Sequence, residues 1–432
     1  MKTRVETRRG APSAILSGMN SRCDARLLSF VILLGCAGVG FAAIFLNIGS
    51  GPMDLSGLDY RVYITAGKMA LNGVGAKFYD LPTQFAVQRE LFPAMTQQDQ
   101  LLPYLAPPFV SLLFAPLALL PLFPGYVVLT AFNVGLLWFI ARAVIEELRL
   151  EGRARLVALL LLLTFAPILF TLLQGQVSLL ISLAFLQSYR AAKAGRDFPA
   201  GIWFSLFLIR PQLALAPLLI FALKGRWKLL GGFALGALVL GGISLLLVGF
   251  EGLANYKTLL GAASGWERIY GVKPQQMQTW RGFVHALLGT DNGALVRAPW
   301  LFGVVAALGA LLWSWRGAWE KAAPRFERQW AIMGIVALFC CPYLYAHDLG
   351  LLSVCGFLIF RAAQIEKSRV GILTFIGYGA VALWAALMAT GATFPSLAVG
   401  FEAFAMLFLS ASDRNPAATQ GQIEGETASL IA

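Results

Sequence analysis

The sequence has few charged residues and no long polar stretch that could form a soluble domain. Charged residues make up 13% of its 432 positions and hydrophobic residues 58%, and the mean hydropathy is +0.71. A soluble domain carries about 25% charged and about 45–50% apolar residues. The composition therefore excludes a chain built of several soluble domains and predicts an all-α, polytopic membrane protein.

Motifs of nucleotide-driven and hydrolytic proteins are also missing. No P-loop, GxSxG or HExxH sequence occurs, which argues against a nucleotide-driven transporter and a serine hydrolase. The five cysteines have neither the spacing of a zinc site nor that of a disulfide framework. No acidic cluster has ligand spacing either, so we predict no metal site and no cofactor.

Acidic residues are in the minority, with 22 Asp and Glu against 34 Lys and Arg, a net charge of +12. Such an excess can indicate nucleic-acid binding, but no basic cluster is interleaved with aromatics in that pattern. Cytoplasmic loops of membrane proteins are rich in Lys and Arg. We therefore expect the bilayer as a partner and no nucleic acid.

Hydropathy divides the chain into three parts. We expect a cytoplasmic basic tail, a single transmembrane domain and a disordered polar tail, at 1–26, 27–411 and 412–432 respectively. Within the domain, an uncleaved first span is predicted at 27–49. Outer-face loops with interfacial helices are predicted at 50–106 and 250–298, and about 11–13 membrane helices in all, including short broken or re-entrant ones.

The basic clusters test this topology. They lie at 142–155, 190–196, 224–228, 316–328 and 361–369. If every apolar segment spanned the bilayer, the first cluster would fall outside, against the positive-inside bias. Segments 108–121, 199–209 and 212–223 are too short for the roughly 17–25 residues of a span. If segment 108–121 enters the membrane and returns to the outer side, and 199–209 and 212–223 form a broken hairpin, every basic cluster lies inside.

This topology places several unusual polar sequences together on the outer side. They are Asp59, "YLAPP" from Tyr104, "QGQ" at 174–176, "IRP" at 209–211 and "YAHDL" at 345–349. The convergence predicts one outward-facing site.

Arg210 is a cation among apolar residues, which at membrane depth indicates a functional site by default. Pro211 breaks the helix beside it, and the planar guanidinium suits a phosphate. The alternative is an arginine that snorkels to the interface. For His347 and Asp348 a solvated interhelical loop is an equal alternative, and the "QGQ" amides fit either sugar hydroxyls or a helix end.

Asp59 lies in "SGLDYRVYITAGKMALNG", just past the first predicted span. As a residue before a helical pattern it fits an N-cap. As an interfacial carboxylate it fits a general base equally well. The spacing of residues alone does not decide between the two.

Five sequences in order resemble the family-87 glycosyltransferases, polyprenyl-phosphate-mannose-dependent membrane proteins of the GT-C class. They are "DYRVYITAGKMALNGVGAKFYD", "YLAPPFVSLLFAPLALLP", "LLQGQVSLLISL", "LFLIRPQLALAPLLI" and "YLYAHDLGLL", and the resemblance covers roughly residues 27–411. Two positions depart from the family pattern: Met277 stands where an asparagine is usual, and Arg210 where a lysine is commoner.

The resemblance implies a bacterial inner-membrane enzyme with its site facing the periplasm or cell exterior. It would transfer a sugar, which in this family is mannose, from a polyprenyl-phosphate donor to a lipid or glycolipid hydroxyl. The transfer would invert the anomeric centre of the sugar. Asp59 would be the general base. The donor phosphate would lie at Arg210, Arg281 and His347, and the sugar or acceptor at Tyr63, Tyr104, Gln174, Gln176, Gln278 and Asp348.

Two other functions fit the same sequence. A transporter or flippase of lipid-linked sugars would use the charge of Arg210 and need no base. An envelope-assembly protein that has lost activity would explain the departure at Met277.

Overall fold

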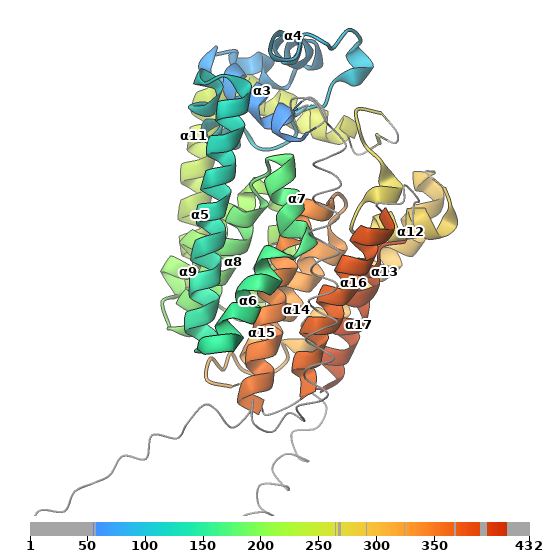
Figure 1. The fold of residues 1–432 in the computed structure, drawn as a ribbon. Helices are drawn as coiled ribbons and strands as arrows, with labels where there is room; N and C mark the ends of the chain where they lie inside the picture. Colours follow the sequence, from blue (N-terminus) through green and yellow to red (C-terminus); the bar gives the residue numbers. More distant parts are fainter. Residues whose placement is uncertain are drawn as a thin grey trace, which may run out of the picture.

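The computed structural model is helical throughout the part of the chain that it describes (Figure 1). That part is Leu55 and residues 58–412, apart from 264, 267–268, 291, 324, 367–368 and 389–394. No strand occurs within it, so the all-α prediction is confirmed. The predicted first span at 27–49 and both predicted tails, except residue 412, lie outside the described residues.

Four described helices are long and apolar enough to cross a membrane. They are α5 (Leu122–Leu148), α11 (Trp227–Ala263), α13 (Gly293–Ser314) and the continuous element Ala346–Glu366, in which α15 is Leu351–Glu366. A fifth span is possible if α6 (Gly152–Leu163) and α7 (Ala166–Gln174), which meet at a 49° bend, count as one. The membrane prediction therefore rests on both composition and helix length.

Shorter helices complete the described fold. Beside the long helices lie α8 (Ser178–Lys193), α9 (Asp197–Phe204), α10 (Leu215–Leu223), α14 (Arg325–Cys340), α16 (Ile372–Met388) and α17 (Leu397–Ser412). At one end lie α3 (Tyr60–Leu71) and α4 (Leu81–Leu91), uppermost in Figure 1, and α12 (Trp280–Leu288) packs against α13 at one side.

The segment 108–121 contains two 3₁₀-helices, Pro108–Leu113 and Leu117–Leu119, and no α-helix. Four prolines between 107 and 121 explain this, because each removes a backbone donor and fixes φ. The segment is too short to cross a bilayer in this conformation, as expected from its length.

The second predicted outer loop, 250–298, contains helical residues at both of its ends. Helix α11 is kinked at Gly249 (φ 69°), the last residue of the predicted apolar segment, and continues beyond it to Ala263. Its last turns pack on the top of the molecule, since Asn255 donates to the Ala76 carbonyl at 3.0 Å. At the other end α13 begins at Gly293, ahead of the apolar run that marked it in the sequence.

The chain from Asp197 to Leu223 is a broken hairpin, as predicted. Arg210 (φ −132°, ψ 74°) separates two 3₁₀-turns, Ser205–Ile209 and Pro211–Ala214, which continue α9 and lead into α10. An ion pair between Arg226 and Asp197 joins the two ends of the hairpin. Arg210 is consequently at the tip, far from the ends of both arms.

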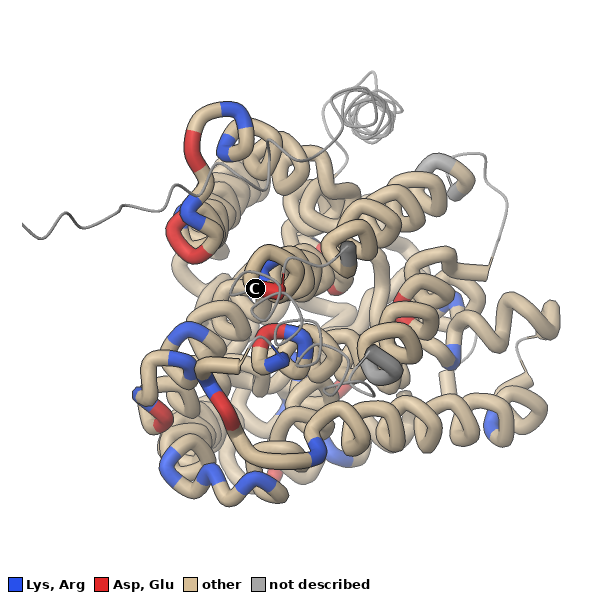
Figure 2. The backbone as a smooth tube through the Cα atoms, turned by 90° about the horizontal axis from the view of Figure 1, so that it is seen from below, with Lys and Arg blue, Asp and Glu red and all other residues tan. Residues whose placement is uncertain are grey.

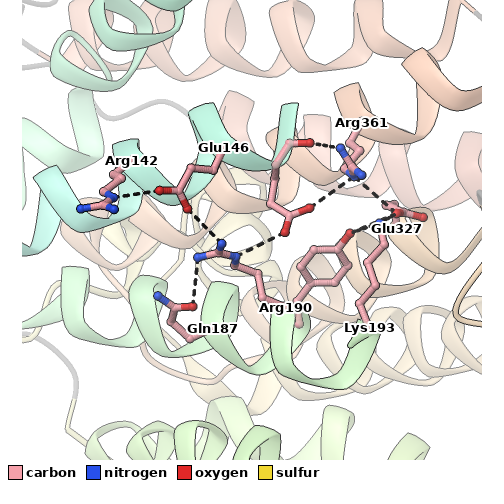
Figure 3. Close-up of polar contacts among 9 residues, drawn as sticks. Arg142, Glu146, Gln187, Arg190, Lys193, Glu327 and Arg361 are labelled. Atoms are coloured by element: carbon pink, nitrogen blue, oxygen red, sulfur yellow. Dashed lines mark hydrogen bonds and ion pairs between the residues drawn. The ribbon is translucent and has the colours of Figure 1, made fainter. Parts of the chain in front are cut away.

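All five basic clusters gather at the opposite end of the molecule, which Figure 2 shows from below. Arg190 pairs with Glu146 at 3.1 Å and with Glu147 at 3.3 Å. Glu327 accepts from the Tyr189 hydroxyl at 3.0 Å and pairs with Lys193 and Arg361 (Figure 3). The network joins α5, α8, α14 and α15, so one face of the protein carries the excess positive charge.

Candidate functional site

The site lies at the end away from the basic clusters. The hydroxyl of Tyr60, in the first turn of α3, donates to the carbonyl of Leu122, the first residue of α5, at 3.2 Å. Glu146, near the other end of α5, is in the basic network. At 1.5 Å per helical residue these two positions on α5 are roughly 36 Å apart, which is about the thickness of a bilayer.

Asp59 occupies the N-cap position of α3, but its side chain makes no capping bond. Its Oδ2 instead accepts from Gln176 Nε2 at 2.7 Å, and its backbone N–H donates to Gln174 Oε1 at 3.0 Å. The capping alternative for the carboxylate is therefore wrong. With 34% of its side chain exposed, the group is open to a ligand.

Gly175 allows both glutamines to reach Asp59. It ends α7 in the left-handed conformation, at φ 65°, which glycine adopts without steric cost. A Cβ there would lie 2.8 Å from Tyr60 Cβ, so the position has neither the backbone freedom nor the space for another residue.

Gly175→Ala is expected to lower activity at least tenfold while the protein still inserts and folds. The added methyl must move α7 away from Tyr60 by several tenths of an ångström, and Gln174 and Gln176 move with it. Small displacements of groups that position a reacting centre cost large factors in rate. Gly135→Ala is the matched control, because nothing lies within 4 Å of its Cβ position; equal loss in both variants would contradict the expectation.

Arg210 reaches across from the hairpin tip to the same cluster. Its Nε lies 3.5 Å from Asp348 Oδ1, and its Nη2 lies 3.5 Å from both Gln176 Oε1 and the Tyr63 hydroxyl. Only 23% of the side chain is exposed. The snorkelling alternative is wrong, because the guanidinium turns inward to polar partners.

Asp348 is the buried anion that holds this cation. Its Oδ1 also accepts from Ser178 Oγ at 2.9 Å, and its Oδ2 accepts from the Tyr345 backbone N–H at 3.3 Å. The side chain is 2% exposed, so the solvated-loop alternative is wrong. A buried carboxylate with several partners fixes the groups around it.

His347 lies between the two carboxylates. Its Nδ1 is 3.6 Å from Asp59 Oδ2 and its Nε2 is 3.2 Å from Asp348 Oδ2, with 5% of the side chain exposed. The imidazole therefore connects the partly exposed acid of the site to the buried one.

These groups open into a pocket of about 180 Å³. Six of the predicted site residues line it: Asp59, Tyr63, Tyr104, Gln176, Arg210 and His347. Burial raises the pKa of Tyr63 to about 12, and burial followed by the charge of Asp59 raises the pKa of Tyr345. Both phenols therefore remain protonated at neutral pH and can donate hydrogen bonds.

The other four predicted residues do not line this pocket. Gln174 and Asp348 lie behind it, in contact with Asp59 and Arg210. Gln278 is buried between the Gln276 carbonyl and the Ser396 hydroxyl, and the Arg281 guanidinium lies 4.9 Å from the centre of the Tyr343 ring. Among the described residues, no group of three His, Cys, Asp or Glu side chains is placed to hold a metal.

The structure adds four residues that the sequence did not single out as site residues: Ser178, Trp266, Tyr270 and Tyr345. Ser178 and Tyr345 are each two or three positions from a predicted site residue, so proximity was an available signal. Trp266 and Tyr270 lie in a long connection with no motif, and only the fold brings them to the pocket.

Comparisons with known proteins agree on one family. The family described as glycosyltransferase family 87 matches residues 104–342, more than half of the 432 positions. A similar curated protein is the polyprenol-phosphate-mannose-dependent alpha-(1-2)-phosphatidylinositol pentamannoside mannosyltransferase of Mycolicibacterium smegmatis. It is 31% identical over 268 residues, which cover 61% of this chain and only 60% of the relative's length. No solved structure matches the chain.

Proposed function

Since this chain belongs to glycosyltransferase family 87, we propose that it moves mannose from a polyprenyl-phosphate donor to a glycolipid hydroxyl. The name of the similar mycobacterial protein contains this donor and a mannosylated phosphatidylinositol. The observation that carries the proposal is the shared pocket of a partly exposed carboxylate, Asp59, and an inward-turned guanidinium, Arg210.

The reaction divides between these two groups. The acceptor oxygen attacks C1 of the donor sugar and forms the new glycosidic bond, while Asp59 takes the hydroxyl proton. The bond between C1 and the phosphate oxygen breaks, and its electrons leave on the polyprenyl phosphate. Arg210 stabilises the growing charge of that phosphate because its cation is already in place. One displacement inverts the anomeric centre and needs one carboxylate.

The contacts suggest how the base is kept in position. Gln176 donates to Asp59 with its Nε2, and its Oε1 accepts from Arg210, so it sets the spacing of base and cation. His347 contacts Asp59 from the other side. Asp348 does not line the pocket, and its bonds support a positioning role through Arg210 and His347 rather than contact with sugar.

We place the site on the outer face of a bacterial inner membrane, because the basic clusters favour the cytoplasm. Single cysteines at Arg153 and Gln98, introduced in a chain without its native cysteines, should report this. An impermeant maleimide added to intact cells whose outer membrane has been opened should label position 98 and leave position 153 unlabelled. The reverse pattern would place the site in the cytoplasm.

Transfer by the purified protein tests the proposed chemistry. Labelled polyprenyl-phosphate mannose and membrane lipids are incubated with the full chain in proteoliposomes, and products are identified by mass spectrometry. A mannosylated lipid with inverted configuration supports the proposal. Movement of labelled donor across the bilayer without a product would indicate a flippase, and neither product nor movement would indicate an inactive assembly protein.

A further inference from the structure

The pocket has an aromatic wall that the proposed reaction does not yet use. The connection between α11 and the 3₁₀-turn Pro274–Gln276 contributes Trp266 and Tyr270 to the lining. The two ring centres are 4.7 Å apart and the rings are inclined at 53°. Trp266 is 7% exposed and Tyr270 is half-buried, so the wall is packed against the protein.

The conformation of this wall is held by contacts on two sides. Tyr270 has a positive φ of 51°, a conformation that is strained for a non-glycine residue and persists where surrounding structure enforces it. Gly271, at φ 75°, has Leu102 Cδ2 2.6 Å from where a Cβ would lie. The Tyr345 hydroxyl accepts from the Lys273 backbone N–H at 3.1 Å.

An aromatic wall beside a polar wall fits a pyranose ring. The face of an aromatic ring carries negative charge, and it attracts the weakly positive C–H groups on one face of a sugar. The hydroxyl groups at the sugar's edge can meanwhile bond to the carboxylate, amide and phenol groups nearby. A lipid alcohol offers no such pair of surfaces.

The position of the wall indicates which sugar it takes. The connection is tied to Tyr345, which lines the pocket. The Tyr345 ring centre is 6.4 Å from that of His347, whose Nδ1 lies 3.6 Å from Asp59 Oδ2. Arg210, where the donor phosphate is proposed to bind, reaches the pocket from the hairpin tip, and its Nη2 lies 3.5 Å from the Tyr63 hydroxyl. Tyr345 and His347 thus link the wall to the base, where the attacking hydroxyl must arrive.

We propose that Trp266 and Tyr270 form the platform for the acceptor's sugar ring, so that the acceptor is a glycoside whose hydroxyl is delivered to Asp59. The inference rests on the proposed function and specifies its acceptor class. It makes these two residues determinants of acceptor choice and leaves the chemical step to Asp59 and Arg210.

Binding of methyl α-mannoside tests the platform without catalysis. Saturation-transfer NMR on the full chain in nanodiscs, with polyprenyl phosphate present, should show transfer to the C–H protons of the sugar. Trp266→Leu should abolish most of that signal, and Trp266→Phe should retain much of it. Trp138→Leu, which changes a 54%-exposed tryptophan on α5, should leave it intact. No signal with wild type, or equal signals in all variants, would overturn the platform.

Kinetics separate the acceptor from the donor. With octyl α-mannoside as acceptor and octanol as the sugar-free comparison, wild type should use only the glycoside. Trp266→Leu should raise KM for the glycoside about tenfold, as expected for loss of a stacked aromatic contact, with an unchanged KM for polyprenyl-phosphate mannose. A raised donor KM alone would assign the wall to the donor and overturn the acceptor assignment.

Tyr270→Leu is a second variant in case the more buried Trp266 is needed for folding, and a smaller effect in the same direction is expected. The two proposals fail in different ways. If wild type transfers no mannose to any lipid but still binds methyl α-mannoside through Trp266, the reaction is wrong and the platform stands. If transfer occurs and Trp266→Leu leaves the glycoside KM unchanged, the platform is wrong and the reaction stands.

Discussion

Asp59→Asn should lower kcat for mannose transfer by about 10²–10⁴, the usual contribution of a positioned general base. Asparagine has nearly the same shape and can still contact Gln176 and His347, which lie 2.7 and 3.6 Å from Oδ2 in the wild type. It cannot accept the acceptor's proton. Donor affinity should therefore change little while turnover is lost, which distinguishes loss of the base from loss of the fold.

The measurement is single-turnover transfer from labelled polyprenyl-phosphate mannose, with donor binding followed separately. Asp80→Asn is the control, since Asp80 caps α4 by accepting from the Thr83 backbone N–H at 2.9 Å and asparagine is also a good cap. Equal rates in wild type and Asp59→Asn would remove Asp59 from the mechanism. A flippase would show no transfer even in the wild type, and its movement of donor across the bilayer would be unchanged in both variants.

Arg210→Gln should lose transfer and stability together. Transfer should fall by about 10²–10³, as for removal of one preorganised charge at a developing anion. The change also leaves Asp348 without the cation that faces its Oδ1, and breaking a buried pair by removing one partner costs about 3–5 kcal/mol. Arg210→Lys keeps the charge, and we expect partial activity with weaker donor binding because the planar donor set is lost.

The double variant Arg210→Gln/Asp348→Asn separates the two effects. Neutralising both partners should restore much of the thermal stability, since no unpaired charge remains buried, whereas transfer should stay low. If the double variant regained both stability and transfer, Arg210 would be a structural residue only. Thermal unfolding in detergent and the single-turnover assay provide the two readouts.

The sequence predicted the general arrangement because long-range rules determine it. Hydropathy identified the long helices, and positive-inside bias required the hairpin at Arg210, whose ends are joined by Arg226 and Asp197 in the structure. Asp59, Gln176, Arg210 and His347 were each unusual in their local surroundings, and they do meet in one pocket.

The sequence could not show which partner each polar residue chooses. Asp59 has the position of an N-cap. It bonds to Gln174 and Gln176 instead because α7, 115 positions away in sequence, packs beside it in the fold. Gln278 was predicted to line the pocket, but its side-chain oxygen accepts a hydrogen bond from the Ser396 hydroxyl instead. The kink at Gly249 coincides with the end of the predicted apolar segment, but the sequence did not show that the helix resumes after this single residue.

The charge at the hairpin tip has a consequence for biogenesis. Arg210 emerges from the ribosome long before its counter-ion Asp348, which lies in the last third of the chain. Until the later helices insert, the hairpin carries an unpaired cation, and this charge disfavours insertion of the hairpin into the bilayer. The pocket can therefore form only after the C-terminal helices have inserted. A chain truncated before Ala346 should fail to form the pocket and should be degraded.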